Sequence, residues 1–205
     1  MAGPRKTAGV SKLLKHYTNI DIYNKKSFNY LVTVTTREYQ PDQEIPQELL
    51  QKACELFRAT IPSFDAEDET KNPELIADRD TPELYRTLLK DRSLILALDT
   101  HNQVAGLLEW YERERENIVL MFITWMMVDQ SRQGSGIASL LHQHFETQSV
   151  PRVAAKTSND VFQALGVHLK NERVIEIYRG WDYEDATAQY NDGRMLCMSK
   201  LVSRK

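Results

Sequence analysis

The segment from Ile118 to Leu141 constrains the fold of this chain more than any other part of it. It opens with the longest apolar run in the sequence, which ends at Val128 and which Thr124 alone interrupts. Such a run is typical of a central strand covered on both faces, and it is too short to cross a bilayer, which takes about 20 residues. A polar loop follows at once, and the apolar residues after it recur at helical spacing: Ile137, Leu140, Leu141 and Phe145. The segment predicts a strand, a loop and a helix in direct succession.

The loop, Asp129 to Gly136, carries two glycines, Gly134 and Gly136. Glycine lets the backbone approach a ligand closely, and the first turn of a helix presents unpaired N–H groups and a positive dipole end. Together these features suit a phosphate or pyrophosphate. The loop lacks the lysine of a P-loop and the third glycine of GxGxxG, so neither nucleotide fingerprint applies. On the residues alone, a turn that uses glycine only for its geometry stays an equal alternative.

Length and composition indicate one globular domain with an appendage. The 205 residues are 41% hydrophobic and 27% charged, which is ordinary for a globular protein. The net charge of −3 excludes a globally basic nucleic-acid binder. Cys54 and Cys197 lie too far apart for a CxxC site, and both are expected to be buried small hydrophobes. With no apolar stretch of signal-peptide length at the N-terminus, we expect a reducing, cytoplasmic location without membrane insertion.

Residues 1–28 differ from the rest of the chain. They hold six lysines and arginines and one acid, Asp21, so their net charge is about +5. Val10, Leu13, Leu14 and Tyr17 recur at helical spacing. A short basic amphipathic helix that touches an anionic partner is one interpretation, and a solvated tail is the favoured one. A chain starting at Ser27 is expected to keep its fold.

The elements before the apolar strand are indicated by local patterns. Three strands are expected, at 30–36, 93–99 and 103–111, with a tight turn at 100–102 between the last two. A helix is expected from Gln43 to Thr60, with a buried face: Leu49, Leu50, Ala53 and Phe57. Residues 65–69 form an acidic loop. A second helix is expected to open with a Thr81 cap and Pro82 at its first position, burying Leu84, Tyr85, Leu88 and Leu89.

Gln133-Gly134-Ser135-Gly136-Ile137-Ala138 fits, at every fixed position, the pattern Gln/Arg-x-x-Gly-x-Gly/Ala. This segment resembles the acetyl-CoA signature of the GNAT superfamily of N-acetyltransferases. Val128, five residues before Gln133, falls where that family has the valine that ends its strand. The resemblance implies an acyl-CoA-dependent enzyme that transfers acetyl, or another short acyl group, to a primary amine by direct attack in a ternary complex.

The later sequence supports the resemblance. Asn171 to Tyr178 resembles the family segment Asn-x-x-Ala-x-x-x-Tyr, although Asp182 and Tyr183 stand where the family has Gly-Phe. Residues 194–200 suit a closing strand. The resemblance covers residues 29–205 as a single domain. It implies an α/β (α+β) fold with a mixed, mostly antiparallel sheet of about seven strands, flanked by helices.

The stretch from Ser149 to Gln163 allows two registers. In the preferred register it is an insertion before a strand at 164–170, and the next helix starts at Asn171. In the second register, residues 152–157 form the fifth strand and Asn159 starts the next helix. The second register leaves about one helical turn too few for the family pattern.

The resemblance assigns cofactor roles residue by residue. The pantetheine chain is expected to pair along the outgoing strand edge, with a backbone N–H near Met126 polarising the thioester carbonyl. The signature loop is expected to donate backbone N–H groups to the pyrophosphate. The implied cofactor-binding set is Met126, Val128, Gln133, Gly134, Ser135, Gly136, Ile137, Ala138 and Asn171. No metal is implied.

For catalysis, Tyr178 is the candidate general acid by its position in the family pattern, and core packing of the same ring is the alternative. Glu109 is the best candidate base, since it lies deepest in its strand. Three further glutamates, Glu112, Glu114 and Glu116, more simply form a solvated strand end with the arginines between them. One common family position for the base holds Phe122, so a water relay is an option. His142 is expected on the polar, solvent-exposed face of the signature helix.

The acceptor cannot be identified from the sequence. Trp110 and Trp125 are candidates for lining its pocket. A small amine, a protein amino group and an aminoacyl RNA stay open as acceptors, and a homodimer is among the open oligomeric states. A non-catalytic CoA-binding regulator on the same fold is the alternative to an enzyme.

Overall fold

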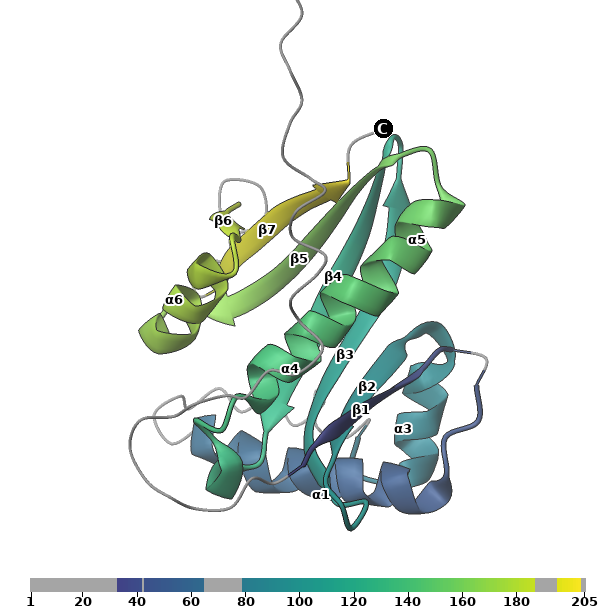
Figure 1. The fold of residues 1–205 in the computed structure, drawn as a ribbon, viewed down its shortest axis with the longest axis vertical. Helices are drawn as coiled ribbons and strands as arrows, with labels where there is room; N and C mark the ends of the chain where they lie inside the picture. Colours follow the sequence, from purple (N-terminus) through teal and green to yellow (C-terminus); the bar gives the residue numbers. More distant parts are fainter. Residues whose placement is uncertain (1–32, 42, 65–78, 187–194, 204–205) are drawn as a thin grey trace, which may run out of the picture. The chain divides into compact units, whose positions relative to one another are not determined.

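Seven strands form one sheet in the order β1-β2-β3-β4-β5-β7-β6 (Figure 1). The structure is a computed structural model that describes residues 33–41, 43–64, 79–186 and 195–203. The only parallel neighbours among the described strands are β4 and β5. The expected mixed, mostly antiparallel sheet is confirmed. The strands are β1 (Thr35–Tyr39), β2 (Ser93–Leu98), β3 (Val104–Arg115), β4 (Ile118–Val128), β5 (Asp160–His168), β6 (Glu184–Asp185) and β7 (Met195–Ser203).

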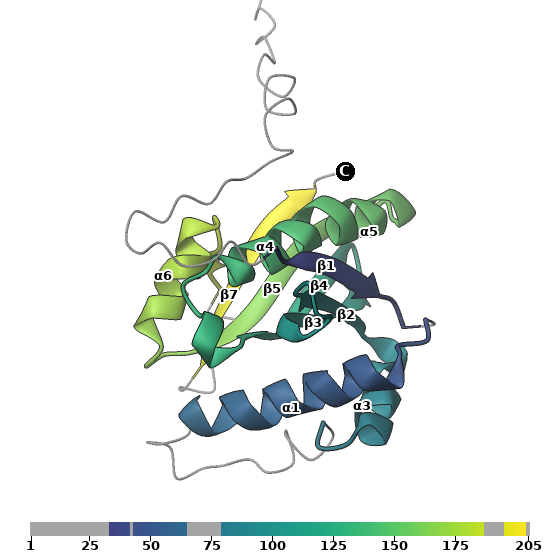
Figure 2. The ribbon, with the colours of Figure 1, turned by 60° about the horizontal axis from the view of Figure 1, so that its bottom comes forward.

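Helices cover both faces of the sheet. Figure 2 shows α1 (Gln47–Phe64) and α3 (Pro82–Leu88) on one face, with α4 (Ile137–His144), α5 (Val150–Lys156) and α6 (Glu172–Gly180) on the other. A separate buried apolar cluster lies on each side. Each amphipathic helix buries its apolar side on the sheet, and this burial is the main favourable term in folding.

The patterns before β4 are largely confirmed. Helix α1 buries the four predicted residues, and the Thr81 hydroxyl caps α3 by accepting a hydrogen bond from the Leu84 N–H at 3.3 Å. Leu84 itself is 49% exposed, so its predicted burial is wrong. The strand predicted at 30–36 is displaced, since β1 begins at Thr35 and ends at Tyr39. The N-terminal segment 1–28 and the acidic loop 65–69 lie outside the described residues.

Strand β4 is central, as its apolar run predicts. Its buried residues alternate over most of its length, and the residues between them are partly exposed. The prediction of cover on both faces is therefore only half right. The exposed end of β3 is confirmed: Glu112 to Arg115 are exposed, whereas Glu109 is fully buried.

The stretch 149–163 is not an insertion. Helix α4 continues through a π-helical turn, Phe145–Ser149, directly into α5, and β5 begins at Asp160 instead of Ala164. The second register, with a strand at 152–157, is wrong because residues 152–156 are helical. Pro151 directly follows the π-helical turn, and the missing N–H of a proline inside a continuous helix is consistent with this departure from regular α-helical hydrogen bonding.

Glu38 of β1 joins this long helix to the edge of the sheet. Its carboxylate accepts hydrogen bonds from both Nη atoms of Arg152, at 2.9 and 2.7 Å, and from the Ser149 hydroxyl at 2.9 Å. The Nε2 atom of His144 lies 3.7 Å away. Burial alone raises the pKa of Glu38, but the hydrogen bonds from Arg152, His144 and Ser149 outweigh it and lower the pKa to about 2.

We expect Glu38→Gln to destabilise the protein at neutral pH but not in strong acid. The pKa is lower in the folded protein than the ordinary 4.5, so the charge stabilises the fold above pH 4.5. That stabilisation is lost as the pH falls toward 2. The shift corresponds to about 3 kcal/mol at pH 7. Urea unfolding of both proteins from pH 2 to pH 7 measures it, and a difference that does not change with pH would contradict the ion-pair account.

Candidate functional site

Strands β4 and β5 pair only over part of their length. The parallel ladder ends at Ile123 and Leu165. Beyond it β5 stays paired with β7 and β4 with β3, so β4 and β5 diverge (Figure 1). From Thr124 to Val128, the β5-facing edge of β4 has no strand partner within the described chain. Buried or half-buried backbone groups require hydrogen bonds, so this edge is suited to an extended ligand.

A β-bulge lies where the two strands part. Glu109 pairs with Trp125 and Trp110 with Ile123, which leaves Thr124 as the extra residue on β4. A bulge bends its strand and increases the local twist. The bulge therefore turns the last residues of β4 away from β5, and Met126 and Val128 lie on this final stretch.

The signature loop has the backbone that its glycines predict. Gly134 and Gly136 have φ values of +79° and +85°, a region that L side chains rarely adopt. The N–H groups of Gln133 and Ser135 donate weakly within the loop, at 3.5 and 3.3 Å. In contrast, no hydrogen bond is found among the described residues for the backbone N–H groups of Gly134, Gly136, Ile137 and Ala138. Such N–H groups at the start of a helix are suited to an anion.

An ion pair fixes the start of the loop. The Arg132 Nη2 atom donates to Asp99 Oδ2 at 2.6 Å, and Asp99 Oδ1 accepts from the N–H groups of His101 and Gln103, both at 2.9 Å. The turn between β2 and β3 is thereby bound to the loop. Since a preorganised loop loses less entropy on binding, this contact favours an anion at the glycines.

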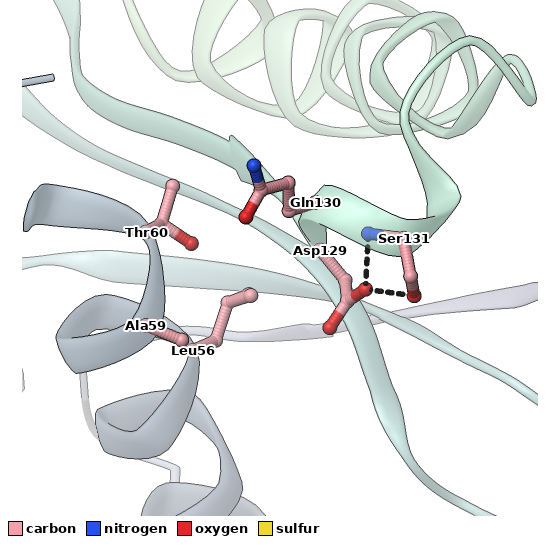
Figure 3. Close-up of a pocket in the computed structure, with 6 residues that line it drawn as sticks. All are labelled: Leu56, Ala59, Thr60, Asp129, Gln130 and Ser131. Carbon is pink, nitrogen blue, oxygen red and sulfur yellow. Dashed lines mark hydrogen bonds between the residues drawn. The ribbon is translucent and has the colours of Figure 1, made fainter. Parts of the chain in front are cut away.

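A pocket of about 440 Å³ adjoins the loop (Figure 3). Leu56, Ala59 and Thr60 of α1 face Asp129, Gln130 and Ser131 across it. The Asp129 carboxylate already accepts hydrogen bonds from the N–H and the hydroxyl of Ser131. Asp129 thus caps the short turn at the start of the loop, and it is the only carboxylate among the described residues that line the pocket.

Tyr178 lies on α6, which follows β5 at the end where β5 has left β4. The ring is buried edge-on against Trp181 and Tyr183, with centroids 5.6 and 5.4 Å away. Its hydroxyl has no hydrogen-bond partner within the part of the chain described. Burial raises the pKa of this hydroxyl above its ordinary value, so it holds its proton at neutral pH. Asn171 begins the same helix.

Behind Tyr178 lies a polar network that the sequence did not predict. His142 stacks on Trp181 at 4.1 Å between centroids, and its Nε2 atom lies 3.2 Å from the Tyr183 hydroxyl, which donates to Gln163. His142 is 3% exposed, so the expectation that it faces solvent is wrong. Burial and the Lys200 ammonium lower its pKa to about 4, against the opposing effect of Glu146. A helical-wheel argument misses it because α6 covers that side of α4.

Glu109 is buried in an ion-pair cluster. Its carboxylate accepts hydrogen bonds from Arg79 at 2.8 and 3.2 Å, from Arg92 at 2.8 Å and from the Thr124 hydroxyl at 2.8 Å. Burial alone raises its pKa, but the hydrogen bond and charge of Arg79, with Thr124 and Arg92, lower it overall. A carboxylate held in this way is a poor proton acceptor at neutral pH, and the geometry does not favour the expected base role.

The two tryptophans lie on different faces. Trp110 is 1% exposed and packs on Phe145 of the π-helical turn, so it does not line an open pocket and this prediction is wrong. Trp125 is half-buried on the α1 face, against Phe57 and the Arg79 guanidinium. Trp125 alone stays a candidate for acceptor contact.

The described residues contain no group of three or more His, Cys, Asp and Glu that could hold a metal ion. Among them, no helix has both the length and the apolar character needed to cross a membrane.

Comparison with known proteins adds structural neighbours only. No protein-family model matches the sequence, and no curated protein matches it. The chain is similar to the solved structure of PaiA N-acetyltransferase from Thermoplasma acidophilum in complex with coenzyme A, at 14% identity and a TM-score of 0.61, over 83% of this chain and 100% of that one.

Two further neighbours have the same coverage of this chain. A GNAT-family acetyltransferase from Staphylococcus aureus Mu50 aligns at 12% identity and a TM-score of 0.59, over 100% of its own chain. Aminoglycoside 6'-acetyltransferase type Ii aligns at 18% identity and a TM-score of 0.58, over 99% of its chain. This chain has the GNAT acetyltransferase fold.

Proposed function

We propose that this protein is an acyl-CoA-dependent N-acetyltransferase that transfers acetyl from acetyl-CoA to a primary amine. One observation carries the proposal: the unpaired edge of β4 leads directly into a loop with two left-handed glycines and unpaired N–H groups. An extended chain that ends in a pyrophosphate matches both parts of this surface. The bound coenzyme A in a neighbour of the same fold supports this ligand class.

The residues present fit such a ligand. The N–H groups of Gly134, Gly136, Ile137 and Ala138 would hold the pyrophosphate, at the positive end of α4. The edge from Met126 to Val128 would pair with the pantetheine amides, and Asn171, which precedes α6, would contribute to the same site. No atom lies within 4 Å of the position that a Cβ at Gly134 would occupy, so the loop surface is open there.

The chain's own groups then serve two tasks in acyl transfer. A backbone N–H near Met126 would polarise the thioester carbonyl as the amine nitrogen attacks its carbon. As the C–S bond breaks, the Tyr178 hydroxyl would give its proton to the leaving thiolate, since that hydroxyl has no other hydrogen bond in the described structure. The amine proton would leave through water, because Glu109 is fully engaged and Phe122 offers no carboxylate.

A second candidate function follows from the lack of a free carboxylate at Glu109 and Phe122. This is a non-catalytic protein that binds CoA on the same fold. The two functions share the cofactor surface and differ only in turnover.

Purified protein tests both candidates. We expect a thermal shift with millimolar CoA, since a ligand held at 100 times its Kd stabilises by about 2.7 kcal/mol. Mass spectrometry after incubation with acetyl-CoA and a panel of polyamines, aminoglycosides, peptides and cell lysate should detect an added acetyl group. A shift without transfer favours the CoA-binding regulator. No shift at all would overturn both.

A further inference from the structure

The β4 bulge is held by Glu109 through Thr124. The Thr124 Oγ1 atom lies 3.1 Å from the Glu109 backbone oxygen and 2.8 Å from Glu109 Oε1. The hydroxyl has one proton, which these two acceptors share. Glu109 and Thr124 are directly linked across the bulge, and we call this link the Glu109–Thr124 clasp.

The clasp lies at the irregularity of the strand pair. The extra residue interrupts the regular ladder between β3 and β4 at Glu109, and the Thr124 hydroxyl contacts the Glu109 carbonyl oxygen and carboxylate at this same point. A side chain thus adds a hydrogen bond where the regular ladder is interrupted. The bulge is therefore stabilised in place by the residue that creates it.

Two arginines make the clasp rigid. Arg79 and Arg92 fix the Glu109 carboxylate from the α1 side, with side chains 4% and 22% exposed. The Arg79 guanidinium also lies 5.6 Å from the ring of Trp125, the residue after the bulge. A buried charged pair is costly unless its geometry is fully satisfied. Here both oxygens of Glu109 accept hydrogen bonds, so the carboxylate is a fixed anchor.

The clasp lies at the start of the edge of β4 that β5 does not cover, the edge proposed to bind the ligand. Thr124 follows Ile123, the last residue of β4 that pairs with β5. The residues after it, Trp125 and Met126, begin the unpaired edge. Any change in the bulge therefore rotates the first backbone groups that a thioester would meet.

We propose that Glu109 is a positioning residue for acyl transfer and not its general base. Through the Glu109–Thr124 clasp it sets the bulge, and the bulge aims the backbone of Trp125 and Met126 at the thioester carbonyl. This role rests on the proposed acetyltransferase function. Misplacing a transition-state donor by about 1 Å can cost on the order of 10²-fold in rate, while ground-state binding is affected little.

The decisive variant is Thr124→Val, which deletes the hydroxyl but keeps the branched shape. We expect its kcat to fall about 10- to 100-fold, with the KM for acetyl-CoA within threefold of wild type and an unchanged pH profile. Thr124→Ser keeps a hydroxyl and should restore most of the rate. Thr36→Val is the matched control, because it removes a strand hydroxyl that bonds to His144 at 2.8 Å, outside the site.

Glu109→Gln separates positioning from base catalysis. If Glu109 is the general base, Glu109→Gln loses activity and the acidic limb of the pH profile, while Thr124→Val keeps near-normal turnover. The clasp predicts that both variants lose rate and keep the wild-type pH profile. Glu109→Gln removes the negative charge that pairs with Arg79 and Arg92, so the melting temperature of this variant is measured first. If Glu109→Gln does not fold, the kinetics of Thr124→Val decide between the two roles.

A second measurement does not depend on catalysis. Amide hydrogen exchange of peptides covering residues 122–128, without ligand, should be about tenfold faster in Thr124→Val than in Thr36→Val. Exchange unchanged by Thr124→Val would overturn the clasp, whatever the protein's activity. If wild type binds no CoA but the exchange rate rises as expected, the clasp stands as a structural device. In that case the acetyltransferase function and the catalytic part of this inference fall together.

Discussion

Gly136→Asp is expected to abolish CoA binding. Gly136 has a φ of +85° and is the N-cap residue of α4. It lies among the backbone N–H groups that are proposed to bind the pyrophosphate. An aspartate there brings a negative charge to the pyrophosphate site and cancels the favourable helix dipole. The thermal shift produced by millimolar CoA in wild type should disappear, which corresponds to a loss of affinity of more than 100-fold.

Gly136→Asn is the matched control for this change. Asparagine has nearly the same shape and, like aspartate, tolerates left-handed backbone better than most residues, but it carries no charge. We expect Gly136→Asn to keep part of the shift and Gly136→Asp to keep none, with both proteins melting cooperatively without ligand. Equal shifts in Gly136→Asp and wild type would show that CoA does not bind at this loop.

Tyr178→Phe is expected to lower turnover by about 10²–10⁴-fold, the usual effect of losing a general acid. The ring and its contacts with Trp181 and Tyr183 remain, so stability should change little. CoA affinity should also change little, because the sulfur needs a proton only as its bond breaks. Turnover and CoA binding are measured on the same preparation, with the amine identified by the acceptor panel.

Tyr39→Phe provides the comparison for a buried tyrosine hydroxyl. Tyr39 is 7% exposed, as Tyr178 is, but it lies on β1 at the far edge of the sheet. Its variant should keep wild-type turnover. Turnover of Tyr178→Phe within threefold of wild type would remove this residue from the mechanism, and a joint loss of affinity and melting temperature would assign it to packing.

The fold around the signature loop could be predicted because its signals are local. An apolar run, a glycine pair and a helical repeat of apolar residues depend on neighbours in sequence, and the strand, loop and helix that they predict follow one another between Ile118 and His144. The helix from Phe145 to Lys156 could not be predicted. Pro151 and a π-helical turn interrupt the 3.6-residue pattern there, and burial of Phe145, Val150 and Val153 in the core stabilises the helix instead.

The candidate site was harder to predict for a related reason. The Glu109 carboxylate is bound by Arg79, which is 30 residues away in the sequence. The His142 ring contacts the hydroxyl of Tyr183, which is 41 residues away. No pattern in one sequence reports such pairings. Glu109 stands next to Trp110 in the sequence, and a glutamate in such a setting can be taken for a catalytic base. Arg79 and Arg92, which pair with its carboxylate, are identified only from the folded structure.

The π-helical turn between α4 and α5 accommodates one more residue than an α-helix would in the same place. In an uninterrupted α-helix, His144 and Arg152 would lie about 80° apart around the axis, but both reach Glu38 because the wider turn realigns them. Deleting one residue from 145–149 would let the turn relax to α-helix, and the two side chains, then seven residues apart, would lie about 20° apart and still face Glu38. Homologous chains that keep Glu38 and Arg152 should therefore either keep this turn or lack one residue of it.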